Sequence, residues 1–581
     1  MKFWAWSCLF LTSLAVAQVN IQWHHPPPSE VKNNIEIALK TYSGFADCDS
    51  ISPLELAQQR QSLGSLLLDS FHAFGYFDAQ FTELEMSSST QCNTWSATLR
   101  LGERAQLYAI EVDADSALYD DPVLTKRYTE LTQHVGKRFS QKHYTAFKDD
   151  IYSLAIARGY FDITMGQSQI VVAQNNRDIT LRYDFEFGDR YVINALELPA
   201  NTINQALLNN IIELKLGEPY ALERINEMRN ALNRSGYFAT VQIRPDLANR
   251  RDGKINLIAT LTEKPKHQVE YGIGFSTDVG PRASVSWKRA RLNDSGHSIR
   301  LSSKVSAPEQ QISATYKVPL ANPNREYINY QLGLERTDFN DSEGLSLSLG
   351  ATRFFPVGHF HERLNDWHAS IFSRYTYSDF TQADVNANTK LWYLGGSLHY
   401  LQTDDMLFPS TGERHDLTLE TAQNSLLSDF TVYRLTAQTK WLRPLSSAWT
   451  WLGIWRAGWM DTDDFTRTPS EQRFYLGGDQ SIRGFGYKDI APRDTNGALL
   501  GGEQSVSTQQ ELIYQINDSW GVAGFFDTAQ ISYNAQSLSA SSVGLGAIWR
   551  SSLGPVRLYA ARGSSTAEST WRLHILLGPV L

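Results

Sequence analysis

The chain has 581 residues, which is long enough for several domains. Its formal net charge of −9 at pH 7 argues against a nucleic-acid partner, because such partners attract basic surfaces. After the first residues, no apolar run approaches the ~18 to 20 residues of a membrane-spanning helix, so any membrane-spanning part must be a closed β-barrel.

The N-terminus predicts export. Residues 1–17 carry one lysine, an apolar run from Phe3 and a small-residue ending at Ala17, which is the pattern of a cleaved secretory signal peptide. Cys8 lies inside this segment, so the mature chain keeps Cys48 and Cys92. Two cysteines in an exported protein favour one disulfide, and we expect Cys48 to pair with Cys92.

Three similar phrases follow, and they predict a repeat. LLDSFHAFGYFDAQF surrounds Gly75, DIYSLAIARGYFDITM surrounds Gly159 and EMRNALNRSGYFATVQI surrounds Gly236; the glycines are 84 and 77 residues apart. In each phrase, apolar residues at helical spacing lead to a glycine that ends the helix, and an alternating strand follows. Residues 18–104, 105–188 and 189–265 are therefore predicted to form three α+β repeats.

The repeats suggest a function beyond packing. Each short sheet has edge strands whose unpaired backbone groups can bind an extended polypeptide without regard to its sequence. A set of such sheets on an exported chain favours a peptide-handling module over a simple scaffold.

Residues 266–581 have the alternation of a transmembrane barrel. In QISATYKVP, Ile312, Ala314 and Tyr316 share one face, and polar residues share the other. A soluble sandwich would also alternate, but it has little use for a row of four tryptophans on one face, as in WTWLGIWRAGW; an outward apolar band with aromatic girdles is typical of an outer-membrane barrel. Those tryptophans are Trp449, Trp451, Trp455 and Trp459.

The number of strands supports a closed barrel. We count sixteen alternating runs, an even number as expected for a bacterial barrel. The sequence thus predicts a transmembrane all-β domain of sixteen antiparallel strands over residues 266–581. The predicted runs are 267–277, 283–291, 297–306, 310–319, 326–337, 344–354, 367–379, 390–402, 412–422, 428–442, 447–461, 504–515, 519–528, 541–550, 554–562 and 570–577.

The longest gap between these runs, residues 462–503, contains GGDQSIRGFGYKD. Long loops in compact folds are usually functional, and the glycines of this one permit tight turns. If the loop folds into the barrel, Arg483 needs carboxylate partners. Glu511 and Asp527, on the next two predicted strands, are the candidates. The alternative is a solvent-exposed arginine in an outer loop.

At this point the chain resembles the BamA/TamA/TpsB superfamily of outer-membrane assembly and translocation proteins. Arg483, Gly484 and Phe485 match the loop-six motif of that superfamily. Other positions match its acidic residue on strand twelve, its aromatic-x-Asp motif on strand thirteen and its glycine-containing C-terminal segment. These positions are Glu511; Phe525 and Asp527; Gly544, Gly546, Gly554 and Pro555.

The resemblance covers nearly the whole mature chain and implies that the repeats are POTRA domains in the periplasm, ahead of an outer-membrane barrel. Three repeats are similar to the TamA branch, whereas BamA-type members typically have five and secretion transporters two; the ending LLGPVL also resembles that branch. The branch implies a TamB-like inner-membrane-anchored partner and autotransporter-like clients. It implies no cofactor, no metal and no nucleic acid.

The ending departs from the terminal aromatic residue common in other barrels, since the last residue is Leu581, and this departure points to a lateral opening between the first and last barrel strands. Pro579 cannot donate a ladder hydrogen bond, so we expect the pairing of these strands to be short. A client strand could then pair with an exposed edge inside the bilayer. The residues predicted to line this opening are Tyr271, Ile273, Phe275, Leu573, Ile575, Leu577, Gly578 and Pro579.

Two other functions remain open. A two-partner-secretion pore would use the same parts to export a soluble protein. A barrel enzyme is not favoured, because the chain has no Gly-x-Ser-x-Gly, phosphate loop or His-Glu-x-x-His, and we expect no enzymatic activity. Two weaker metal candidates are interpreted as solvated loop residues. They are His359, His361, Glu362 and His368, and the acidic run Asp461, Asp463 and Asp464.

Overall fold

The computed structural model describes residues 19–42, 51–86, 93–359, 366–479, 481–552, 554–565 and 569–578. The predicted signal peptide, the Cys48–Cys92 disulfide and Pro579 lie outside these ranges. Among the described residues, no helix combines the length and the apolar character needed to cross a membrane.

The first α+β unit is a three-stranded sheet with two helices. Its longer helix starts with a capping box, in which Ser52 and Glu55 satisfy each other's backbone N–H groups. The strand order is β1-β3-β2, with β1 parallel and β2 antiparallel to β3. The elements are β1 Asn20–Trp23, α1 Ser29–Thr41, α2 Pro53–His72, β2 Gln80–Met86 and β3 Thr94–Arg100.

The second unit repeats this plan. Its main helix ends at Gly159, whose φ of 94° is the left-handed conformation expected of a glycine C-cap. Its strand order is β4-β7-β5, and β6 also pairs with β7. The elements are β4 Gln106–Ala114, α3 Ala117–Asp120, α4 Pro122–Thr132, α5 Gln141–Arg158, β5 Thr164–Met165, β6 Gln169–Val172 and β7 Asp178–Glu186.

The third unit has the strand order β8-β10-β9, and β8 runs parallel to β10. The repeated helix–glycine–strand phrase thus has the same place in each unit. The elements are β8 Val192–Glu197, α6 Gln205–Ile212, α7 Leu222–Arg234, β9 Phe238–Pro245, the 3₁₀ turn η1 Leu247–Asn249 and β10 Lys254–Glu263.

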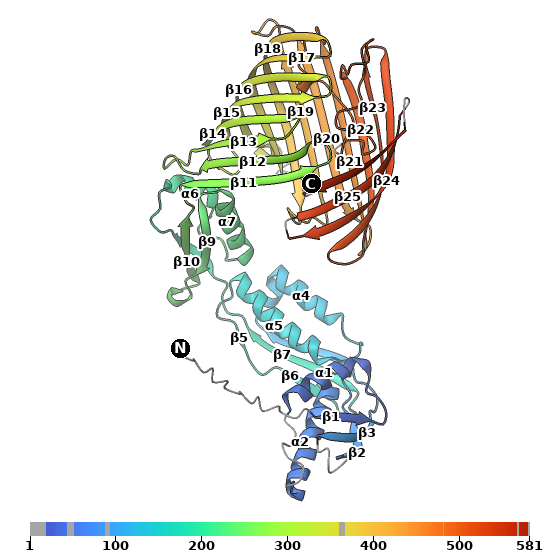
Figure 1. Cartoon of the computed structure of the whole chain (residues 1–581). Coiled ribbons are helices and arrows are strands. Elements are labelled where there is room, and N and C mark those ends of the chain that lie inside the picture. Colours follow the sequence, from blue (N-terminus) through green and yellow to red (C-terminus); the bar gives the residue numbers. More distant parts are fainter. Residues whose placement is uncertain are drawn as a thin grey trace, which may run out of the picture. The chain divides into compact units, whose positions relative to one another are not determined.

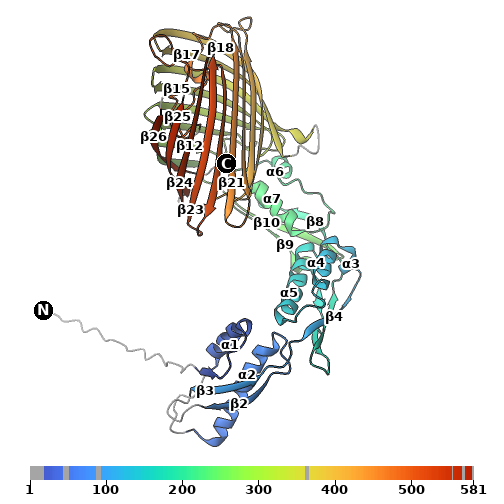
Figure 2. The same cartoon turned by 90° about the vertical axis from the view of Figure 1, so that its right-hand side faces the viewer.

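The rest of the chain forms the predicted sixteen-stranded antiparallel barrel, which is confirmed (Figures 1 and 2). Every strand pairs with its sequence neighbour. The strands are β11 His267–Ser276, β12 Gly280–Arg289, β13 Ser298–Val305, β14 Glu309–Pro319, β15 Tyr327–Phe339, β16 Ser342–Pro356, β17 Trp367–Gln382, β18 Val385–Thr403, β19 Gly412–Ala422, β20 Val432–Pro444, β21 Trp449–Thr462, β22 Gln504–Gln515, β23 Trp520–Tyr533, β24 Gln536–Ser551, β25 Gly554–Ser565 and β26 Ser569–Leu577. Two further 3₁₀ turns are η2 Val357–His359 and η4 Ser470–Gln472.

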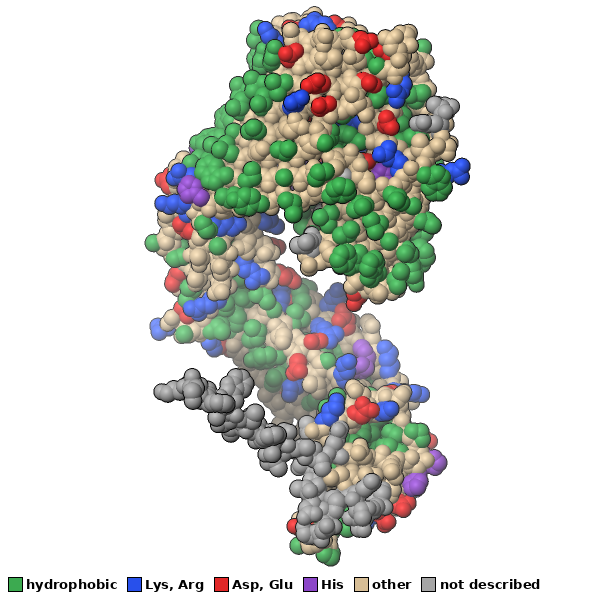
Figure 3. Space-filling view, in the orientation of Figure 1, with side chains coloured by type: hydrophobic (Ala, Val, Ile, Leu, Met, Phe, Trp, Pro, Cys, Tyr) green, Lys and Arg blue, Asp and Glu red, His purple; other side chains and the backbone are tan. Residues whose placement is uncertain are grey.

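The outer surface of the barrel is apolar, as a bilayer requires. Hydrophobic side chains gather over the barrel strands on the face shown in Figure 3. Strands β17 to β21 also carry an outward row of aromatic rings in mutual contact, which includes part of the tryptophan row seen in the sequence. Its members are Trp367, Tyr400, His415, Trp441, Trp455 and Trp451.

The barrel sheet begins at β11 and ends at β26, and within the described residues no ladder joins these two strands. We call this boundary the seam. On the β11 side, Tyr271 and Ile273 are 82% and 91% exposed; on the β26 side, Leu573 is 73% exposed. The seam therefore presents apolar side chains on two strands whose outer edges carry no backbone pairing.

Two helices of the third unit contact the short turns of the barrel. The side-chain amide of Asn322, in the turn after β14, donates to the Asn210 carbonyl (3.2 Å) and to Glu213 (2.8 Å). Arg291, after β12, pairs with Glu263 at 2.5 Å and donates to Thr202. These bonds join the last residues before the barrel to its turns.

Candidate functional site: the loop inside the barrel

The loop between β21 and β22, residues 463–503, is a folded structure, and we call it the motif loop. Short bridges join Phe474 to Gly502 and Leu476 to Ile490. Arg473, which is buried, donates to three backbone carbonyls of the loop, at Thr466, Thr468 and Leu500, over 2.7 to 2.9 Å. The loop therefore has an internal scaffold that holds Arg483 in place.

Apolar side chains fix the motif loop against the barrel wall. Leu476, Ile482 and Phe485 are buried together with Ala529 and Ile531 of β23. This burial explains the aliphatic and aromatic residues on either side of Arg483-Gly484.

Two glycines of the motif lie so close to other backbone atoms that a larger residue would not fit. A Cβ at Gly477, where φ is 105°, would lie 2.2 Å from the Gly486 carbonyl oxygen. A Cβ at Gly484 would lie 2.3 Å from the Cα of Gly563 on β25. Gly484 and Gly563 thus let the loop backbone lie directly against the barrel strand.

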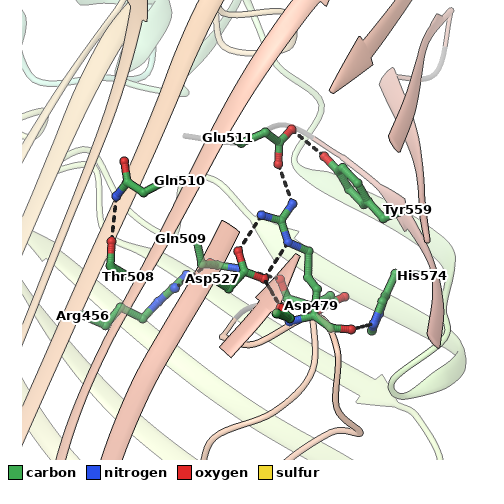
Figure 4. Close-up of polar contacts among 11 residues, drawn as sticks. Arg456, Asp479, Thr508, Gln509, Gln510, Glu511, Asp527, Tyr559 and His574 are labelled. Atoms are coloured by element: carbon green, nitrogen blue, oxygen red, sulfur yellow. Dashed lines mark hydrogen bonds and ion pairs between the residues drawn. The ribbon is translucent and has the colours of Figure 1, made fainter. Parts of the chain in front are cut away.

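Arg483 is 3% exposed. It binds the carboxylates of Glu511 and Asp527, which are labelled in Figure 4. Its Nε donates to Oδ2 of Asp527 (3.0 Å), its Nη2 to Oδ1 of Asp527 (2.7 Å) and its Nη1 to Oε2 of Glu511 (2.5 Å). The backbone N–H of Arg483 also donates to Asp527 at 3.0 Å. The pairing with Asp527 is bidentate, the geometry for which a guanidinium is best suited.

Further groups from the wall complete the site. The hydroxyl of Ser542, on β24, donates to Asp527 at 3.0 Å, and that of Tyr559, on β25, donates to Glu511 at 2.8 Å. The guanidinium carbon also lies 3.5 Å from the centroid of the Phe525 ring. Each buried carboxylate oxygen therefore has a donor, as a buried ion cluster needs in order to be stable.

The same site reaches the seam through His574 on β26, which is 1% exposed. Its Nε2 contacts the carbonyl oxygen of Arg483 (Figure 4). Its Nδ1 lies 3.3 Å from the hydroxyl of Thr277 and 3.7 Å from Asp278, both in the turn that joins β11 to β12. Asp278 in turn accepts the backbone N–H of Asp479 at 2.5 Å. The motif loop thus contacts both sides of the seam.

The structure brings together the residues that the motif singled out: Arg483, Glu511, Phe525 and Asp527. It places the predicted opening residues on β11, on β26 and at Gly578. Sequence reasoning missed Ser542, Tyr559, Asp278 and His574. The inward strand phase of Ser542, Tyr559 and His574 was visible, but it does not tell which inward residues meet, and Asp278 lies in a turn, where there is no strand phase to follow.

The chemistry of the site is that of a structural ion cluster. One permanently charged cation is matched to two carboxylates, and the hydroxyls of Ser542 and Tyr559 donate to those carboxylates. In the described ranges, no three His, Cys, Asp or Glu side chains lie close enough to hold a metal ion. The candidates His361 and Glu362 fall outside those ranges.

Comparisons with known proteins agree with this architecture. An Omp85 superfamily domain matches residues 288–572, and a POTRA model described as a surface antigen variable number repeat matches residues 191–264. The outer membrane protein assembly factor BamA of Neisseria meningitidis is 22% identical over 489 residues, covering 77% of this chain and 59% of the relative. BamA of Nitratidesulfovibrio vulgaris is also 22% identical, covering 61% and 46%. The chain therefore spans about half the length of the curated relatives that it matches.

A solved structure shows the same fold. The crystal structure of BamA from Haemophilus ducreyi lacking POTRA domains 1–3 aligns with a TM-score of 0.60 at 15% identity, over 82% of this chain and 99% of that one.

Proposed function

Because an Omp85 superfamily domain matches residues 288–572 and a POTRA model matches residues 191–264, we propose that this chain is a member of that superfamily and assembles other proteins into the outer membrane. The single observation that carries the proposal is the seam. A barrel that only needed to be stable would close its sheet, because an unpaired strand edge in lipid leaves backbone groups unsatisfied. Here β11 and β26 are left as the two ends of the sheet.

A client strand can use this edge. If a client strand pairs with β11, its backbone N–H and C=O groups form hydrogen bonds with β11 before the strand enters the bilayer fully. The exposed Tyr271 and Ile273 would then pack beside the lipid-facing residues of the client. The edge strands of the α+β units would hold the extended client before this step.

The ion cluster of Arg483 supports the same function as a brace. It fixes the motif loop to β22, β23 and β25, which lie on the β26 side of the seam. Through His574 and Asp278 it also contacts the two strands that must separate. The ion cluster keeps the rest of the barrel folded while the contacts between β11 and β26 are replaced by contacts with the client strand.

The number of α+β units favours the TamA-like branch within the superfamily. Three such sheets precede the barrel. On this assignment, autotransporter-like outer-membrane proteins would be the clients and a TamB-like protein, anchored in the inner membrane, would be the partner. No enzymatic step, cofactor or metal enters the proposal.

Site-specific crosslinking in cells tests the proposal. A photoreactive residue at Tyr271, and separately at Ile575, should capture a nascent outer-membrane barrel through its terminal strand. A photoreactive residue at Leu417, an exposed outward position on β19, is the control and should capture little.

The rival function, a pore that exports a soluble protein, has its own outcome. A photoreactive residue at the lumen-facing Gln331 would then capture a secreted chain, while Tyr271 and Ile575 capture none. That result would refute the assembly function and leave the seam as the place where the barrel closes.

A further inference from the structure

The inner face of β11 has no side chains at two consecutive inward positions. Gly272 and Gly274 alternate with the outward Tyr271, Ile273 and Phe275. In the β11–β12 ladder, Gly272 is opposite Ser284 and Gly274 is opposite Arg282. At these two positions the edge strand is therefore bare toward the lumen, and the inward side chains opposite them belong to β12.

Arg282 fills the space above Gly274. A Cβ at Gly274 would lie 2.7 Å from Nε of Arg282, 3.2 Å from its Cγ and 3.5 Å from its Cδ. The arginine side chain thus lies over Gly274 of β11 and not only above its own strand. Because neighbouring strands are about 4.8 Å apart, a guanidinium that lies over β11 is within reach of the inward side chains of a strand added at the edge of β11.

The surroundings leave the charge of Arg282 available. Arg282 lines a cavity of about 660 Å³ with Gly272, Gly274, Ser284 and Lys304. Four carboxylates also line this cavity: Asp278, Glu309, Glu335 and Asp479. Asp278 accepts the N–H of Asp479, and Glu309 accepts the hydroxyl of Tyr487. Within the described residues, Arg282 itself has no ion pair.

We propose that Arg282 is a specificity-determining residue, which binds a carboxylate on the lumen-facing side of a strand that adds to β11 opposite Gly274. This inference rests on the assembly function proposed above. The added strand alternates its side chains between lipid and lumen, so its lumen-facing residue beside Gly274 has the guanidinium as its nearest side-chain neighbour. A Glu or Asp there forms a charge-assisted pair, whereas a Lys is repelled.

The test uses the full-length protein in lipid vesicles, with a photoreactive residue at Tyr271. The probes are three fluorescent twelve-residue peptides of alternating apolar and Ser/Thr residues, which differ only at one central lumen-facing position: Glu, Gln or Lys. The measured quantity is the yield of crosslinked peptide. We expect the Glu peptide to exceed the Lys peptide by about three- to fivefold.

Variants assign this preference to the side chain. Arg282→Gln should abolish it, Arg282→Glu should reverse it, and Arg282→Lys should retain part of it. The matched control is Arg300→Gln, on the lumen face of β13 opposite Lys288, which should leave the ratio unchanged. Heat-modifiable migration on gels establishes that each variant barrel is folded.

The possible results distinguish a failure of the role of Arg282 from a failure of strand addition at β11. Equal crosslinking of the three peptides would refute the role of Arg282 and leave strand addition at β11 standing. Absence of crosslinking with every peptide would refute strand addition at β11, and the inference would fall with it. A ratio that persists in Arg282→Gln would also overturn the assignment.

Discussion

Arg483 and Phe525 form a face-on pair: the guanidinium carbon lies 3.5 Å from the ring centroid. The ring covers one face of the cation, while carboxylates bind its edges. An arginine can stack on the Phe525 ring and bind the carboxylates at the same time, because its N–H groups point outward in the guanidinium plane, which the ring covers only on one face. A lysine could not, which explains why the loop is built around this residue type.

The carboxylate of Asp527 is the first group whose removal should matter. It is fully buried, and it accepts the backbone N–H and two side-chain N–H groups of Arg483. Asp527→Ala leaves a buried cation with only Glu511, so we expect the free energy of unfolding to fall by about 3 kcal/mol. Urea unfolding in lipid vesicles, followed by tryptophan fluorescence, measures this.

An exposed ion pair on the same barrel provides the control. Arg336 and Glu343 lie 2.9 Å apart, with both side chains more than half exposed. Glu343→Gln should change the stability by less than about 1 kcal/mol. If Asp527→Ala costs no more than this control, the ion cluster is not a brace.

The Tyr559 hydroxyl tests the supporting hydrogen bonds of the cluster. It donates to Glu511 at 2.8 Å in a buried setting, and Tyr559→Phe removes only that bond. Since the acceptor is charged, the loss should be about 1.5 to 3 kcal/mol. The matched control is Tyr514→Phe, an exposed outward ring three residues from Glu511 on β22, which should be nearly neutral. Equal effects of the two variants would contradict the assigned role.

Gly484 tests whether the loop must touch the barrel strand. In Gly484→Ala the new methyl group would meet the Gly563 backbone at 2.3 and 2.5 Å, so the loop has to move or the strand has to bend. We expect a loss of about 1–3 kcal/mol and faster proteolysis within residues 463–503. Gly524→Ala on β23 is the control, because its Cβ would meet only Leu545, at 3.8 Å. Protection equal to that of the wild type would show that the close approach is dispensable.

His574 tests the contact between the motif loop and the seam. His574→Ala removes the contacts with the Arg483 carbonyl, Thr277 and Asp278, so β26 should move more freely against β11. Spin labels at Tyr271 and Ile575 should report a broader distance distribution in the variant. The control is His399→Ala on β18, a histidine that pairs with Asp416 away from the seam. An unchanged distribution in His574→Ala would mean that the histidine does not restrain the seam.

Glu263 should give a measurable pH dependence. Burial raises the pKa of its carboxyl, but bonds from Arg291 and Thr202 outweigh this and lower it from 4.5 to about 2. A depressed carboxyl pKa contributes stability that is full above about pH 5 and is lost as the pH falls toward about 2. The free-energy difference between wild type and Glu263→Gln should therefore shrink over that interval.

Arg291, the partner of Glu263, provides a second test of this pH dependence. The free-energy difference between wild type and Arg291→Gln should shrink over the same interval but by less, because the bonds from Thr202 remain. The double variant should add little to Glu263→Gln, which already removes the ion pair. A difference that stays constant between pH 5 and pH 2 would show that the Glu263–Arg291 pair does not stabilise the folded protein.

The fold could be predicted from the sequence because strand alternation and the repeated phrases are local signals. Arg483, Glu511 and Asp527 were also within reach, since a motif and the inward phase of two strands identify them. His574 and Asp278 were not. Their meeting depends on the stagger between β26 and the ten-residue strand β11, which sequence alternation does not reveal. Arg282 over Gly274 is hidden for the same reason: alternation tells which way a side chain points, but not how far it leans over its neighbour.

The position of the motif loop in the sequence bears on when the barrel is completed during folding. The partners of the Arg483 cluster, Glu511, Asp527, Ser542, Tyr559 and His574, all follow the loop in the sequence. This cluster therefore cannot be completed until the last strand has been added, and until then Arg483 lacks groups that make its burial favourable. We therefore expect the Arg483 cluster to form late in the folding of this barrel, after all sixteen strands are in place.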